Sequence, residues 1–131
     1  MAGSTHALVT SYILAVGEHR LDDLAEMLDP EAEFTVGETT FSGAAAFIGA
    51  FKPLMPIIVR NDIRRVFVDG DEAVAIYDFV TDTPVGAVLS VEHIRVRDGR
   101  IVSSVLVFER QRWPEVQAEL AARASREPAV A

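Results

Sequence analysis

Two polar side chains lie among apolar residues, where they could take part in proton transfer. Glu92 belongs to a strand-like run in which alternation places it with Ile94 and Val96. Burial on an apolar face favours a protonated carboxyl group, which can donate a hydrogen bond to a carbonyl oxygen. The alternatives are an ordinary pair with an arginine or a side chain that faces solvent. Tyr12 lies in a helical apolar stripe and is either a second donor or a core tyrosine.

Proton transfer also needs a base, and we consider Glu38 and Glu109 for that role. Glu109 ends the last predicted strand, near the expected mouth of a pocket, where a solvated carboxylate is the simpler alternative. We predict that an apolar pocket is lined by large side chains, each of which could equally belong to a plain core. They are Phe34, Val36, Phe51, Met55, Tyr77, Phe79 and Trp113.

Other kinds of site find little support. His93, Arg95 and Arg97 alternate with Glu92 and indicate a solvated or subunit-contacting surface. No histidine shares metal-ligand spacing with another histidine or a carboxylate, so we predict no metal. The chain has no nucleophile elbow and no glycine-rich phosphate loop. We therefore predict chemistry without a cofactor.

The composition indicates a domain with a large hydrophobic core and an acidic net charge that disfavours polyanionic partners. The chain has 131 residues, of which 50% are hydrophobic, and a net charge of −8. This charge argues against nucleic acids and anionic membranes as partners. No stretch approaches the ~20 apolar residues of a membrane-spanning helix, and the N-terminal segment does not resemble a signal peptide. Because the chain has no cysteine, we expect a cytoplasmic protein.

Apolar residues at helical spacing predict the helices that must position these groups. Ser4 or Thr5 is expected to cap the first helix and Ser42 the third. The Asp29-Pro30 pair is expected to end the second helix. The predicted helices cover residues 8–16, 21–28, 44–51 and 113–124.

Between the third and the last helix the hydrophobic period changes to two. Asp69-Gly70 and Asp98-Gly99 are tight-turn signals that predict hairpins. Helices followed by a sheet favour an α+β fold. Residues 1–124 are predicted to form one domain and residues 125–131 a flexible tail. Because the strands are apolar on both faces, we predict a homodimer through the sheet face. The predicted strands cover residues 57–69, 72–82, 87–97 and 100–110, with a short edge strand at 33–36.

The order of these elements resembles the NTF2-like superfamily, and three motifs carry the resemblance. They are residues 12–28, the turn Phe41-Ser42-Gly43-Ala44 and the hairpin from Glu92 to Val102. The hairpin is the most specific and is similar to one that is common in SnoaL-like and ketosteroid-isomerase-like proteins. The resemblance covers about residues 5–113. It implies a cone in which N-terminal helices pack on a strongly curved antiparallel sheet that encloses a pocket.

The same resemblance implies an enzyme that isomerises, cyclises or dehydrates a small apolar molecule with a carbonyl or hydroxyl group. Ketosteroid isomerases hold the substrate oxygen with a tyrosine and a protonated acid, and Tyr12 and Glu92 stand at the matching positions. Tyr12 precedes Leu21 by nine residues, as in that family. No carboxylate stands at the family's base position, Thr35 to Val36. The alternatives are a non-catalytic dimeric binder of a small hydrophobic ligand and an assembly module with a filled interior.

Overall fold

The structure, a computed structural model, describes residues 2–126 of the chain. The last five residues of the predicted tail, 127–131, lie outside the described residues. The first two, 125 and 126, belong to the final helix. The described helices do not include one that is long and apolar enough to cross a membrane.

The helices form close to their predicted positions, but the expected caps were wrong. Helix α1 begins ahead of Ser4 and Thr5, and the Thr5 hydroxyl donates to the Gly70 carbonyl oxygen at 3.1 Å. Gly43 precedes α3 without a side-chain cap, while Ser42 donates to Glu33 at 3.3 Å. Both hydroxyls thus bond to distant parts of the chain. The helices are α1 (Ala2–Gly17), α2 (Leu24–Met27), α3 (Ala44–Gly49) and α4 (Trp113–Arg126), with 3-10 turns η1 (Leu21–Asp23) and η2 (Lys52–Leu54).

Six strands form one sheet in the order β2-β1-β6-β5-β4-β3. Strands β3 to β6 are an antiparallel meander, as predicted. The predicted edge strand is the end of β1, which instead lies inside the sheet between β2 and a parallel neighbour, β6. Alternation reveals a strand but not its place in a sheet, so this error has a physical reason. The strands are β1 (Leu28–Val36), β2 (Thr39–Ser42), β3 (Ile58–Asp69), β4 (Glu72–Thr81), β5 (Ala87–Arg97) and β6 (Arg100–Phe108).

Two tight turns close the meander with the expected residues. Asp98 and Gly99 both have positive φ, +53° and +75°, as a type I′ turn requires. Gly70 has a φ of +62° in the turn between β3 and β4. Both hairpins therefore depend on residues that tolerate left-handed backbone conformations.

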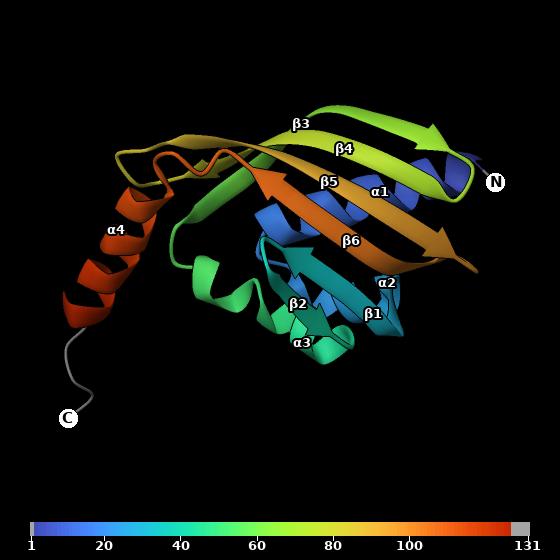
Figure 1. Cartoon of the computed structure of the whole chain (residues 1–131), viewed down its shortest axis with the longest axis horizontal. Helices are drawn as coiled ribbons and strands as arrows, with labels where there is room; N and C mark the ends of the chain where they lie inside the picture. Colours follow the sequence, from blue (N-terminus) through green and yellow to red (C-terminus); the bar gives the residue numbers. More distant parts are fainter. Residues whose placement is uncertain (1, 127–131) are drawn as a thin grey trace.

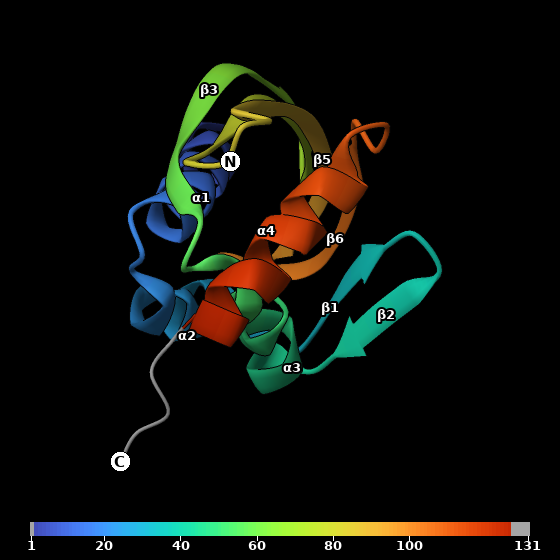
Figure 2. The ribbon, with the colours of Figure 1, turned by 90° about the vertical axis from the view of Figure 1, so that its left-hand side faces the viewer.

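The sheet is strongly curved and does not close into a barrel. Register shifts interrupt the pairing of β3 with β4 and of β5 with β6, and such bulges increase the local twist. Figure 1 shows the strands curving over α1, with α2 and α3 beside β1 and β2. Figure 2 shows α4 lying across the open side of the curved sheet. Every second residue of β4 and β5 is buried on the concave face, which therefore carries the core.

Candidate active site

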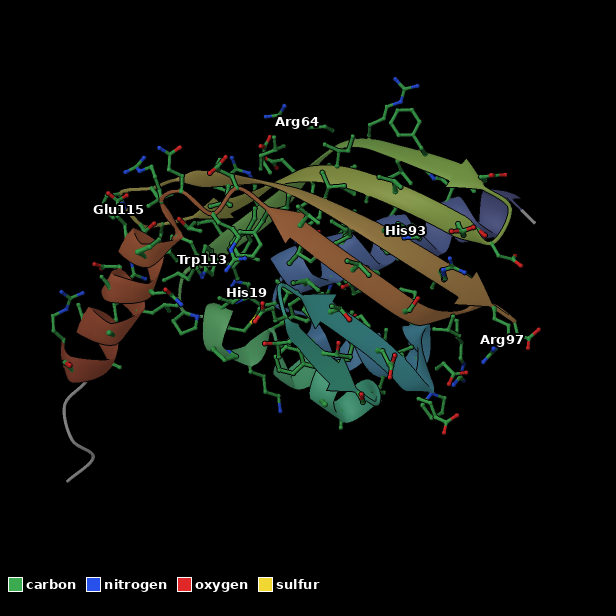
Figure 3. The ribbon with its side chains drawn as sticks, in the orientation of Figure 1. His19, Arg64, His93, Arg97, Trp113 and Glu115 are labelled. Carbon is green, nitrogen blue, oxygen red and sulfur yellow. The ribbon has the colours of Figure 1, made fainter. Side chains whose placement is uncertain are left out.

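A cavity of about 360 Å³ lies on the concave face of the sheet. Its wall is mostly aromatic and aliphatic, and α4 contributes Trp113 and Gln117. Trp113 lies where α4 meets the end of the sheet (Figure 3), and its ring makes a tilted contact with Phe79 and an edge contact with Phe108. Cavities of this size and character suit small, mostly apolar ligands.

The cavity wall includes six of the residues predicted to bind substrate: Phe34, Val36, Phe51, Tyr77, Phe79 and Trp113. Met55 is not on this wall and instead borders a surface hollow with residues 19–23. A role in binding substrate stays a prediction for each of them. The polar groups on the wall include Tyr77, Asn61 and Ser90, and none of the wall residues is a carboxylate within the described chain.

Behind the wall, Glu92 is buried in a cluster of hydroxyl groups. Its side chain points to the concave face, as the alternation predicted, and is 1% exposed. The Tyr77 hydroxyl donates to Glu92 Oε1 at 2.7 Å, and the Ser104 hydroxyl donates to Oε2 at 2.7 Å. These residues come from β4, β5 and β6, and each partner is a diagonal neighbour of Glu92 in the strand register. Antiparallel neighbours thus converge on one carboxyl group.

Burial sets the proton affinity of this cluster. It raises the pKa of Glu92 above its ordinary value, although the nearby hydroxyl groups of Tyr77, Ser104 and Tyr12 act in the opposite direction. Burial and the negative charge of Glu92 raise the pKa of Tyr77 well above its usual value. The cluster therefore favours a neutral phenol and holds Glu92 closer to protonation than an exposed glutamate.

Tyr12 lies at the edge of the same cluster. It is fully buried, and its ring makes edge contacts with Phe47 and Phe51 at centroid distances of 5.9 and 6.3 Å. Burial and then the charge of Glu92 raise its pKa well above the usual value. Yet its hydroxyl makes no hydrogen bond of good geometry with any described residue. Tyr12 and Glu92 are brought together, but neither is on the cavity wall, whereas Tyr77 is both on the wall and bonded to Glu92.

The two carboxylates considered as bases lie elsewhere. Glu38 is exposed in the turn between β1 and β2, and Glu109 is exposed after β6. Glu109 accepts a hydrogen bond from the Gln111 backbone N–H at 2.7 Å. Neither belongs to the cavity wall. Glu92 is the one buried carboxyl group in residues 2–126, and that part of the chain holds no cluster of three or more potential metal ligands.

The SnoaL-like domain family matches residues 9–104, which is most of the chain. The chain belongs to the SnoaL-like domain family. Among curated proteins, none has a sequence that matches it.

Solved structures confirm the fold of this SnoaL-like chain. An NTF2-like protein from Cytophaga hutchinsonii superposes with a TM-score of 0.71 at 17% identity, covering 85% of this chain and 95% of that one. A protein described as a polyketide cyclase from Sinorhizobium meliloti has a TM-score of 0.69 at 20% identity, with coverages of 77% and 94%. One described as a ketosteroid isomerase from Kribbella flavida has a TM-score of 0.73 at 16% identity, with coverages of 82% and 79%. At these identities the likeness concerns the fold alone.

Sequence reasoning missed three polar residues on or behind the cavity wall: Asn61, Ser90 and Ser104. A signal existed for one of them, because Ser90 alternates with Glu92 on β5. The Asp98-Gly99 turn alone would pair Glu92 with Val105, and the register shift between Arg95 and Val96 brings Ser104 beside Glu92 instead. Asn61 had no such signal, because β3 has register shifts on both sides of it. Those shifts make its orientation unreadable from alternation.

Proposed function

We propose that this SnoaL-like chain is a cofactor-independent enzyme that isomerises, cyclises or dehydrates a small apolar molecule with a carbonyl or hydroxyl group. The observation that carries the proposal is the Tyr77 hydroxyl on the cavity wall, hydrogen-bonded to buried Glu92. Tyr12 and Glu92 act as the predicted oxyanion-stabilising pair. Because neither is on the cavity wall, they act on a ligand oxygen through the Tyr77 hydroxyl. Folds shared with proteins described as a polyketide cyclase and a ketosteroid isomerase support this class.

The protonation state of Glu92 decides what Tyr77 offers to a ligand. When Glu92 is protonated, it donates to the Tyr77 oxygen, and the Tyr77 O–H is free to donate to a ligand oxygen. A donor in this position stabilises negative charge that develops on that oxygen in the transition state. When Glu92 is ionised, Tyr77 donates to it and turns an oxygen lone pair towards the cavity.

In its other protonation state, with Glu92 ionised, the same pair supplies a base although the cavity wall lacks a carboxylate. A proton that leaves the ligand is taken by the Tyr77 oxygen, while the original Tyr77 proton moves to Glu92 Oε1. The hydrogen bond of 2.7 Å between these atoms is short enough for that transfer. The reverse movement returns a proton to another ligand atom. The Tyr77–Glu92 pair thus acts as both acid and base without assistance from Glu38 or Glu109.

The test is hydrogen exchange on a set of small ketones. Cyclohexanone, 2-cyclohexenone and 2-tetralone are incubated with the protein in D₂O, and the loss of α-hydrogens is followed by proton NMR. We expect Tyr77→Phe and Glu92→Gln to lower the rate by ~10²–10³-fold, and Tyr12→Phe to lower it as well. Glu109→Gln is the matched control and should retain the wild-type rate. Wild-type rates in both Tyr77→Phe and Glu92→Gln would overturn the mechanism.

A non-catalytic binder of a small hydrophobic ligand is the second candidate. The exposure of Glu38 and Glu109 favours it, because the cavity wall then offers no separate base. A binder would take up the same ketones, and Tyr77→Phe would weaken their binding, but no ketone would exchange faster than in buffer. Exchange above the buffer rate that depends on Tyr77 excludes this candidate.

Either function would operate in a homodimer formed through the convex face of the sheet. Phe67, Val74, His93 and Val105 are cross-strand neighbours on that face, and Val107 beside them is 64% exposed. A second copy that covers this patch would remove its apolar surface from water. We expect a dimer by light scattering and a monomer for Val107→Asp.

The lack of cysteine favours the cytoplasm as the place of action.

A further inference from the structure

Asn61 carries a buried side-chain acceptor without a described partner. It lies on the cavity wall, and its side chain is almost fully buried, with 6% of the residue exposed. The side-chain Nδ2 donates to the Ile13 carbonyl oxygen of α1 at 2.9 Å. No described residue donates to Oδ1. Because the partner of the amide is a carbonyl oxygen, only the NH₂ group can face α1, so Oδ1 is the free end.

A close approach of α1 to β3 holds this amide in place. A Cβ atom on Gly17 would lie 2.4 Å from the Asn61 backbone nitrogen and 3.1 Å from the Asn61 Cβ. Glycine is therefore required where the end of α1 meets β3. With the backbone packed against α1 and Nδ2 bonded to Ile13, the amide cannot turn without losing its hydrogen bond. Oδ1 is a fixed acceptor rather than the end of a mobile surface side chain.

A buried acceptor without a partner is unusual and costs stability. The surrounding wall offers Oδ1 little compensation, because it consists mostly of aromatic and aliphatic side chains. A ligand with an O–H or N–H group near Asn61 would remove this cost on binding. A ligand that places an ether or a methyl group there would leave the acceptor unpaired.

Asn61 and Tyr77 lie on the same concave face as diagonal neighbours on adjacent strands. Asn61 pairs with Phe79 across β3 and β4, and Tyr77 is two residues before Phe79. Such diagonal neighbours are ~7–8 Å apart between Cα atoms. One ligand the size of a single six-membered ring could therefore reach both groups.

We propose that Asn61 determines specificity by accepting a hydrogen bond from a ligand hydroxyl group, so that the substrate is an apolar hydroxy-ketone. Its hydroxyl group donates to Asn61 Oδ1, and its carbonyl oxygen accepts from Tyr77. The assignment of the carbonyl end rests on the proposed function of Tyr77, whereas the assignment of the hydroxyl end rests on Asn61 itself.

The experiment compares 4-hydroxyacetophenone with 4-methoxyacetophenone, which differ in the hydroxyl donor. Calorimetry gives both affinities, and quenching of Trp113 fluorescence reports binding in the cavity. We expect the wild type to prefer the hydroxyl compound on the order of 10-fold or more. Asn61→Leu should abolish the preference. Ser90→Ala, a control on the same wall, should keep it, because the Ser90 hydroxyl already donates to the Val88 carbonyl oxygen at 3.2 Å.

Equal affinities of the two compounds for the wild type would overturn the proposal, even if Asn61→Leu fails to fold. So would a preference that survives in a folded Asn61→Leu variant, or failure of both compounds to bind at millimolar concentration. The proposed catalytic function fails separately, if Tyr77→Phe and Glu92→Gln keep the exchange rate of the wild type. The hydroxyl preference at Asn61 can then still be present.

Discussion

Two glutamates on opposite faces of the same sheet have pKa values that are shifted in opposite directions. Glu92 on the concave face is buried with Tyr77 and Ser104, and its pKa is raised. Glu72 on the convex side has a side chain that is 46% exposed and lies 2.8 Å from His93, and its pKa is lowered. Figure 3 shows His93 on the face of the sheet that looks away from α1.

Both carboxyl groups have hydrogen-bond donors, so hydrogen bonding alone does not explain the difference. The donors to Glu92 are neutral hydroxyl groups, and the loss of hydration outweighs them. Glu72 keeps its water, and the hydrogen bond from His93 and the charge of Arg95 favour the ionised form. Burial decides the direction of the shift at one site, and donors decide it at the other.

Removing each carboxyl group in turn should change the free energy of unfolding by the most unequal amounts. Glu92→Ala leaves the hydroxyl groups of Tyr77 and Ser104 without their acceptor and opens a void, so we expect a loss of ~2–4 kcal/mol in the free energy of unfolding. Glu72→Ala removes an exposed pair and should lower the urea midpoint much less than Glu92→Ala does. Urea unfolding followed by circular dichroism measures both, and equal losses would contradict the difference in burial.

Removing one donor from each carboxyl group gives a smaller effect. Ser104→Ala should cost about 1 kcal/mol of the free energy of unfolding, because a buried hydrogen bond to Glu92 Oε2 is lost. His93→Ala, the matched change on the convex face, should leave that free energy unchanged within error. A larger loss for His93→Ala than for Ser104→Ala would reverse the ranking of the two faces.

The smallest effect is the pH dependence of stability, which should have opposite signs for the two glutamates. The raised pKa of Glu92 means that its protonated form stabilises the fold, and this contribution is lost as the pH rises from the ordinary glutamate value through the raised one. The unfolding free energy of the wild type minus that of Glu92→Gln should therefore fall with rising pH. The lowered pKa of Glu72 makes the same difference for Glu72→Gln rise, because its contribution is lost only as the pH falls. Urea unfolding from pH 3 to 8 measures both slopes, and slopes of the same sign would contradict the account.

The sequence allowed the orientation of Glu92 to be predicted but not its partners. Alternation along β5 predicted that Glu92 shares a face with Ile94 and Val96, and the structure shows that this face is the concave one. The contact with Tyr77 depends on the register of β4 with β5, and the connection from Thr83 to Gly86 does not specify that register. Tyr77 was therefore predicted to line the pocket but not to bond to the acid.

Other errors arose because contacts distant in the chain decided the outcome. Thr5 and Ser42 bond to Gly70 and Glu33 instead of capping helices. The orientation of Asn61 depends on bulges in β3 and on α1, which no local pattern reveals. The fold followed from periodicity and turn residues, whereas the polar contacts of the site required the full strand register.

The most direct test of the account is the pKa of Glu92 in the folded protein. Carbon-13 NMR of carboxyl-labelled glutamate, with Glu92→Gln to assign the signal, should show Glu92 titrating above the ordinary glutamate range and Glu72 below it. The Tyr77→Phe variant should raise the pKa of Glu92 further, because a hydrogen bond that favours the ionised form is removed. A Glu92 signal that titrates at or below the ordinary value would contradict the raised pKa of the acid behind the cavity wall.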